Sequence, residues 1–224
     1  MESASIRARE PMAGERGAQS VGAAQVREGW TPADPGPLGL AAFALTTFVL
    51  SMFNADLVNK AGEPVVLGLA LGYGGLAQVL AGMWEFRTGN TFGAVAFTSF
   101  GAFWLSFWAF VTFFAGEIPA AHVGDAVGLY LIAWGIFTTY MFVASLRTTA
   151  AIALVFFLLA VTFFLLGIGN AGENEGMVEI GGWFGLATAA AAWYASFAAV
   201  VNSTFGRTVL PVRSLAVARE ERRR

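Results

Sequence analysis

Six apolar segments dominate the sequence, and each is close to the roughly 20 residues that a helix needs to cross the hydrocarbon core of a bilayer. They lie at about 38–56, 64–84, 91–115, 124–145, 149–169 and 180–201. The loops between them are short and hold most of the Gly, Pro, Asn and charged residues, which leaves almost no room for a soluble domain. The sequence therefore predicts an all-α integral membrane protein, a single bundle of six transmembrane helices.

The composition supports this prediction and excludes several classes of chemistry. Hydrophobic residues make up 57% of the 224 residues, charged residues only 12%, and the mean hydropathy is +0.64. The chain has no cysteine and one histidine, which excludes disulfides, thiol nucleophiles and His-rich metal centres. The apolar segments also lack paired carboxylates for acid–base chemistry. We therefore expect neither an enzyme nor a bound metal or cofactor.

The sequence divides into three parts. Residues 1–33 are rich in Ala, Gly, Glu and Arg and have no apolar periodicity, so we expect a disordered N-terminal tail. The membrane domain spans 34–212 and begins with the sequence DPGP, because prolines are excluded from a helix interior but suit its first turn. A basic C-terminal tail follows at 213–224.

The basic residues predict the orientation. With six spans, the two tails and the loops that hold Arg87 and Arg147 lie on one side, and together they carry 12 of the 13 Lys and Arg residues. Lys60 and seven acidic residues lie on the other side. The positive-inside rule therefore places both termini in the cytoplasm of a multi-pass protein of the cell membrane. The acidic outer face would repel a free carboxylate at low salt.

The second segment carries one uncharged polar side chain, Gln78, midway along its length. Gly68, Gly72, Gly75 and Gly82 recur at helical spacing, and Gln78 shares their predicted face. A glycine stripe allows close helix packing in lipid, and a buried amide needs a polar partner, a substrate or a wet cavity. We therefore predict that Gln78 points into the bundle and marks a polar path.

The first segment presents a mixed face. Phe43, Thr47, Leu50 and Asn54 follow one another at steps of four, three and four residues, with Thr46 beside Thr47. Alternating aromatic, hydroxyl, aliphatic and amide groups are typical of a weakly polar transport path. In the alternative interpretation, the two threonines hydrogen-bond to their own helix carbonyls and Asn54 caps the helix end. The mixed face of the first segment, taken together with the buried amide of Gln78 in the second segment, favours the interpretation as a transport path.

Motifs spread over residues 34–212 resemble the acetate uptake transporter family, also called the GPR1/FUN34/YaaH family. They occur in the family's order and lie at 34–40 (DPGPLGL), 73–78 (YGGLAQ), 89–93 (GNTFG), 97–101 (FTSFG), 130–138 (YLIAWGIFT), 167–170 (GIGN) and 205–211 (FGRTVLP). The resemblance implies a six-helix protein that assembles as a homo-hexamer with one pathway per protomer. It also implies transport of acetate and related short monocarboxylates, and of succinate in some members.

The same resemblance implies a hydrophobic constriction formed by Phe43, Phe100 and Leu159. Phe100 stands where bacterial members commonly have tyrosine, which removes one hydrogen-bond donor from the narrowest point. Asp34 stands where the family usually has asparagine, and it either caps the first helix or tunes substrate release or proton coupling near the cytoplasmic exit. The other aromatic residues of the third segment are expected to be packing.

Two groups of residues complete the predicted site. We assign the substrate pathway to Thr46, Thr47, Asn54, Tyr73, Gln78, Thr98 and Ser99. Glu85 lies seven residues beyond Gln78 and is, with Asp34, our candidate for proton coupling. The alternative for Glu85 is an ion pair with Arg87 or a contact with Arg207 at the membrane surface.

No Lys or Arg lies inside an apolar segment, so an acid in transit must be neutralised by a proton or surrounded by hydrogen-bond donors. We therefore predict proton-coupled transport of acetate through a gated hydrophobic constriction. A passive anion channel fits the same residues. A channel for small neutral solutes such as urea, or a sensor that responds to acid or ammonium, are the alternatives from other classes.

Overall fold

The computed structural model describes residues 30 and 32–215. The chain divides into two units, 1–31 and 32–224, and every described helix belongs to the second unit. Most of the predicted N-terminal tail and residues 216–224 of the predicted C-terminal tail lie outside the described residues, so the expected disorder of these tails stays a prediction.

Six helical stretches of the described residues are long and apolar enough to cross a bilayer, which confirms the predicted all-helical membrane fold. The first is α1 (Gly36–Asn54), and the second joins α2 (Val65–Leu71), the π-helix η2 (Gly72–Ala77) and α3 (Gln78–Thr88). The third joins α4 (Thr91–Ala109) to the π-helix η3 (Phe110–Phe114). The others are α5 (Ala120–Ser145), α6 (Ala150–Ala171) and α7 (Glu175–Phe205), and the short 3₁₀ turns η1 (Lys60–Gly62) and η4 (Ala115–Glu117) complete the chain.

Local capping explains where several helices begin and end. Asn90 accepts a hydrogen bond from the Gly93 amide at the start of α4, at 3.1 Å. Asn174 accepts one from Met177 at 3.0 Å, so α7 begins five residues before the apolar segment predicted from residue 180. Gly206, with φ of 62°, ends α7 in the left-handed region that favours glycine. The helix therefore extends beyond the apolar segment at both ends.

The second span is not the uniform α-helix that the sequence predicted. The π-helix η2 has more residues per turn than an α-helix. The side chains of α2, before it, are therefore rotated about the helix axis relative to those of α3, after it. Gly68 and Gly72 are exposed, with no atom within 4 Å of an added Cβ, whereas Gly75 and Gly82 are buried. The prediction that all four glycines share the face of Gln78 is therefore wrong for Gly68 and Gly72.

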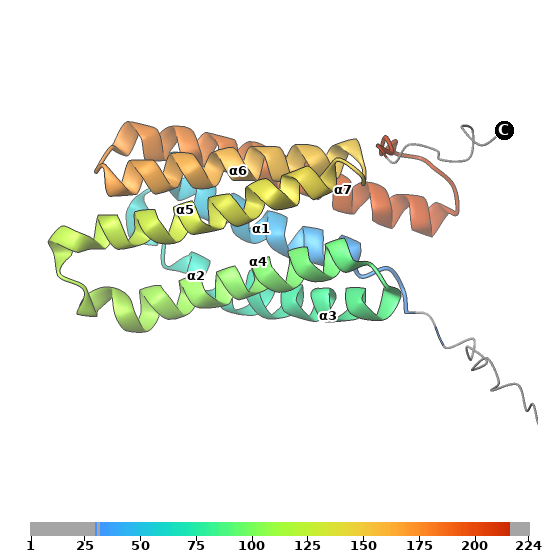
Figure 1. Cartoon of the computed structure of the whole chain (residues 1–224), viewed down its shortest axis with the longest axis horizontal. Helices are drawn as coiled ribbons and strands as arrows, with labels where there is room; N and C mark the ends of the chain where they lie inside the picture. The colour runs from blue at the N-terminus through green and yellow to red at the C-terminus, as the bar shows by residue number, and fades with distance from the viewer. Residues whose placement is uncertain (1–29, 31, 216–224) are drawn as a thin grey trace, which may run out of the picture. The chain divides into compact units, whose positions relative to one another are not determined.

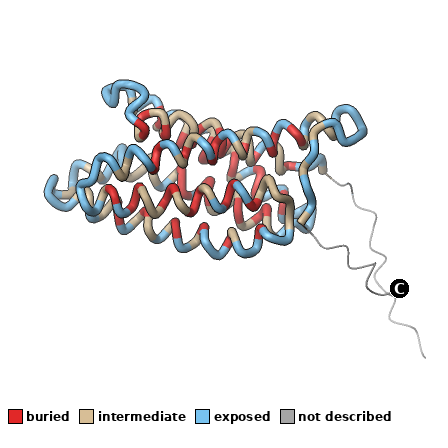
Figure 2. Tube along the Cα trace, turned by 90° about the horizontal axis from the view of Figure 1, so that it is seen from above, coloured by how far each residue is buried: buried red, intermediate tan, exposed pale blue. Residues whose placement is uncertain are grey.

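The helices pack side by side, and their buried faces meet along the inside of the bundle (Figures 1 and 2). Consecutive spans alternate in direction, so α1, α4 and α6 run one way while α3, α5 and α7 run back. The backbones of α1 and α7, α6 and α7, α5 and α6, and α3 and α4 lie close together, whereas those of α4 and α5 lie farther apart and are bridged by aromatic side chains. This wider spacing leaves space for a cavity.

Two glycines of the second span allow a matched test of packing. An alanine Cβ at Gly82 would lie 2.5 Å from the backbone nitrogen of Thr98, so Gly82→Ala forces α3 and α4 apart and is expected to destabilise the protein by about 1–3 kcal/mol. Gly72→Ala meets open space and is expected to be neutral or stabilising by up to about 1 kcal/mol. Thermal unfolding in detergent measures both, and equal midpoints would contradict this packing.

Candidate functional site

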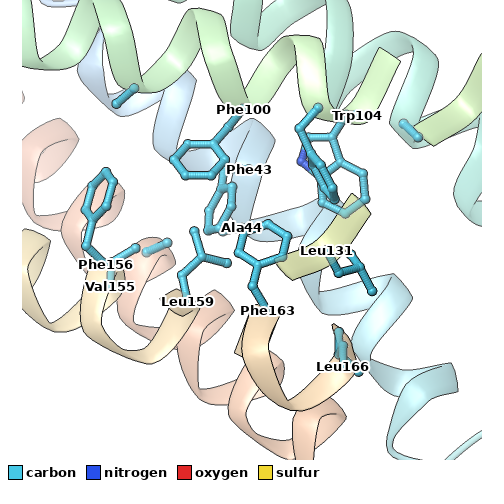
Figure 3. Close-up of a cluster of buried hydrophobic side chains, with 14 of the residues drawn as sticks. Phe43, Ala44, Phe100, Trp104, Leu131, Val155, Phe156, Leu159, Phe163 and Leu166 are labelled. Carbon is cyan, nitrogen blue, oxygen red and sulfur yellow. The ribbon is translucent and has the colours of Figure 1, made fainter. Parts of the chain in front are cut away.

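The structure brings Phe43 of α1, Phe100 of α4 and Leu159 of α6 together inside the bundle (Figure 3). Their side chains are only 4%, 3% and 4% exposed, and the ring centroids of Phe43 and Phe100 lie 5.8 Å apart. We call these three residues the constriction. The three residues come from three different helices. A movement of one of these helices relative to the others would therefore change the distances between the three side chains.

Further aromatic rings pack around Phe100. Its centroid lies 5.9 Å from that of Phe156, 5.4 Å from Phe137 and 6.1 Å from Trp134. The ring of Phe163 stacks on it at 6.4 Å with an interplanar angle of 9°. These separations are typical of packed aromatic clusters. Phe100 is therefore held inside a packed aromatic cluster.

A cavity of about 560 Å³ ends at the constriction, where Phe43 and Leu159 form part of its wall. The cavity extends towards the end of the bundle where α1 and α6 end and α4 is linked to α5. Most of its lining is apolar, and its polar lining residues are Thr47, Ser51, Asn54, Glu63, Tyr130, Thr162 and Asn170. No Lys, Arg or His is among the described lining residues. The cavity therefore offers dipoles and one carboxylate, but no fixed cation, to a solute.

The structure separates the two neighbouring threonines of α1. Thr46 is fully buried outside the cavity lining, and its hydroxyl donates a hydrogen bond to the Ala42 carbonyl at 2.9 Å. It therefore makes the bond to its own helix that the alternative interpretation expected. Thr47 lines the cavity, as Asn54 does, and its hydroxyl has no hydrogen-bond partner among the described residues.

The predicted pathway residues of the second and third spans lie elsewhere. Tyr73, Gln78, Thr98 and Ser99 do not line the cavity. Gln78 is 1% exposed, and its Oε1 atom and the hydroxyl of Thr98 are buried without a hydrogen-bond partner among the described residues. Gln78 thus points into the bundle, but the cavity does not reach it. A role for these four residues in a path stays a prediction.

Glu85 and Asp34 lie near each other at the end of the bundle opposite the cavity. Glu85 is 2% exposed and accepts a hydrogen bond from the Thr88 hydroxyl at 3.0 Å. A Cβ added to Gly36 would lie 3.0 Å from Asp34 Oδ1 and 3.6 Å from Glu85 Oε1, so both carboxylates face the first turn of α1. Asp34 accepts a hydrogen bond from the Gly36 amide at 2.9 Å, as the capping alternative expected.

Sequence reasoning missed several residues of the cavity wall. Trp104 is 2% exposed, lines the cavity, and has an indole nitrogen with no partner among the described residues. Tyr130 also lines the cavity, and its hydroxyl donates to the Phe103 carbonyl at 3.0 Å. Trp104 follows Phe100 by four residues, which is the one sequence signal that could have placed it on the same face.

Comparison with known proteins gives a consistent result. The sequence profile of the GPR1/FUN34/yaaH family matches residues 17–217. Acetate permease A of Emericella nidulans is 45% identical over 195 residues, covering 80% of this chain and 65% of the permease, so the chain spans slightly less than two thirds of that relative. The succinate-acetate/proton symporter SatP of Escherichia coli is 41% identical over 180 residues, covering 80% of this chain and 95% of the symporter.

The fold matches a solved structure as well. The chain aligns with the structure of the bacterial acetate channel SatP at a TM-score of 0.76 and 41% identity, covering 81% of this chain and 99% of that one. The similarity therefore extends over the whole described bundle rather than over a single motif.

The absence of native cysteine allows a direct test of the cavity. We expect a cysteine at Asn54, in the cavity wall, to react readily with a water-soluble thiol reagent in detergent. A cysteine at Ala44, a 0% exposed residue of the same helix, should react at least about tenfold more slowly, because its reaction requires local opening. Mass spectrometry over a time course measures both rates. Equal rates would mean that no water-filled cavity reaches Asn54.

Proposed function

The chain belongs to the GPR1/FUN34/YaaH family, and from that premise we propose that it transports acetate and related short monocarboxylates, and succinate in addition, across the cell membrane. The observation that carries the proposal is the closed aromatic constriction at the inner end of a weakly polar cavity. The identity to the named acetate and succinate-acetate transporters extends over 80% of this chain in each case.

The chemistry of the cavity favours a small acid over a larger or strongly charged solute. A bare carboxylate loses several kcal/mol when it leaves water without a compensating charge, and the described lining holds no cation. The species that crosses the constriction is therefore the protonated acid, or an anion that keeps hydrogen bonds to hydroxyl and amide dipoles. Phe43, Phe100 and Leu159 act in this proposal as the gate that separates the cavity from the other end of the bundle.

We assign proton coupling to Glu85, with Asp34 as its neighbour. Glu85 is a buried carboxylate beside the first turns of α1 and α4, where free amide groups favour negative charge but solvent is scarce. It lies at the opposite end of the bundle from the cavity, so a proton released from the acid after the constriction would meet it before reaching water. Gln78 and Thr98 belong in this proposal to the inner half of the path.

The membrane arrangement follows the distribution of charge. We propose that both termini are cytoplasmic, that the cavity opens to the outside, and that the domain 34–212 assembles as a hexamer with one path per protomer. Large apolar side chains on the outside of the described bundle, such as Leu129, Ile136 and Phe197, suit contact with lipid or with another protomer.

A passive acetate channel is the second candidate. It is favoured by the lining of the cavity, in which Glu63 is the only carboxylate among the described residues. The two candidates differ in whether a proton accompanies each acetate.

We expect purified wild-type protein in liposomes to take up labelled acetate faster than protein-free vesicles, with internal acidification that follows uptake. The acidification arises because each acetate carries a proton in the proposed cycle. A trapped pH-sensitive dye and a radiolabel measure both quantities, and a potential-sensitive dye reports the membrane potential. Uptake that builds a potential without acidification would favour the channel, and the absence of uptake would contradict both.

The assignment of Glu85 is tested in the same vesicles. Glu85→Gln keeps the size of the side chain and removes its charge. Acetate uptake is therefore expected to continue, while the internal acidification per acetate taken up falls. Glu179→Gln, at an exposed position of α7, is the control and should behave as wild type. Unchanged coupling in both variants would mean that the proton takes another route.

Leu159→Ala is expected to widen the constriction. Loss of the isobutyl group opens space beside Phe43 and Phe100, so uptake of butyrate relative to acetate should rise by about tenfold. Competition of labelled acetate uptake by a series of longer acids measures this change. Leu154→Ala, an exposed position on the same helix, is the matched control. An unchanged substrate profile would place the gate elsewhere.

A further inference from the structure

Two hydrogen-bond donors without partners lie directly beside the constriction. The Thr47 hydroxyl and the Trp104 indole nitrogen are buried, and neither has a partner among the described residues. Thr47 is 6% and Trp104 is 2% exposed, and both residues belong to the wall of the cavity. A buried donor without a partner is unfavourable, so such groups in a native protein call for a functional explanation.

The helix geometry places the two donors at the same level. Phe43 of α1 and Phe100 of α4 are in ring contact, and α1 and α4 run in the same direction. Thr47 follows Phe43 by four residues, and Trp104 follows Phe100 by four residues, so each lies about one turn further towards the cavity. In Figure 3, the nitrogen of Trp104 lies on the side of the indole ring towards Phe43.

Three other polar groups of this wall have hydrogen-bond partners within the protein. The Thr162 hydroxyl donates to the Leu158 carbonyl at 2.8 Å, and the Tyr130 hydroxyl donates to the Phe103 carbonyl at 3.0 Å. The amide of Asn170 donates to the Leu166 carbonyl at 2.8 Å. Thr47 and Trp104 therefore differ from these neighbours in having a free donor next to the closed gate.

We propose that Thr47 and Trp104 form the binding site for the carboxyl group of the substrate, on the cavity side of the constriction. Both groups are hydrogen-bond donors, and the two oxygen atoms of a carboxyl group are acceptors. The ring contacts around Phe100 leave an apolar surface for the short hydrocarbon end of the acid. This inference rests on the proposed transport function and adds the residues that recognise the substrate.

The site is latent in this structure. Both residues line the cavity, but the two donor atoms themselves are covered by neighbouring side chains. Separation of Phe43 from Phe100 would uncover them from the cavity side. The movement that widens the constriction thus also exposes the two donors. Their hydrogen bonds to the acid replace those that the acid made to water. Recognition and opening are coupled, and a solute without a hydrogen-bond acceptor gains nothing from the exposed donors.

Conservative variants test this site in liposomes through the acetate concentration that gives half-maximal uptake. Thr47→Val and Trp104→Phe each remove one donor and keep an apolar side chain of similar shape, so each is expected to raise this concentration roughly tenfold. Thr47→Ser keeps the hydroxyl and should stay close to wild type. Thr138→Val and Trp108→Phe are matched controls, because neither residue lines the cavity, and both should also stay close to wild type.

The outcomes separate this inference from the proposed function. Wild-type protein that takes up acetate, with unchanged half-saturation in Thr47→Val and Trp104→Phe, overturns the site alone. Equal weakening in Thr47→Val and Thr47→Ser also overturns it, because the cause would then be packing rather than a hydrogen bond. Wild-type protein that moves no acetate overturns both. Circular dichroism and size-exclusion chromatography of every variant establish that the comparison is between folded proteins.

Discussion

Removing a carboxylate from water is the physical problem that the proposed transport path has to solve. In that proposal the narrowest point lies at Phe43, Phe100 and Leu159, and the described cavity wall holds no cation to replace the lost hydration. In the proposed mechanism, the apolar residues exclude ions and water while they are packed together, and the donors of Thr47 and Trp104 become available only when these residues separate. The proposed gate and the proposed binding site would thus be two states of the same layer of side chains.

Much of the fold could be predicted because a bilayer imposes strict rules on length and polarity. Six segments of membrane-spanning length predicted six helices, and the helices of the structure follow them closely. The π-helix η2 could not be predicted, because its wider turn depends on how the sequence GYGG packs against α1 and α4 rather than on any period in the sequence. That single irregularity moved Gly68 and Gly72 away from the face of Gln78.

The site was predictable in part, and for different reasons at different residues. The periodicity of α1 correctly placed Thr47 and Asn54 on the side of Phe43, while it could not separate Thr46, which is the next residue and bonds to its own helix. The constriction came from family resemblance, since Leu159 has no distinguishing feature in the sequence. Trp104 was missed because one more aromatic residue in an aromatic-rich helix carries no signal, and only the structure identifies its nitrogen as unpaired.

The π-helix η2 holds one extra residue in the turn between α2 and α3. Returning that residue to ordinary α-helical winding would rotate Val65–Leu71 by about 100° around its own axis while α3 stayed in place. The turn that would absorb this rotation packs closely on α1 at one point, since a Cβ added to Gly74 would lie 2.6 Å from the Thr46 hydroxyl oxygen, whereas Gly72 faces open space.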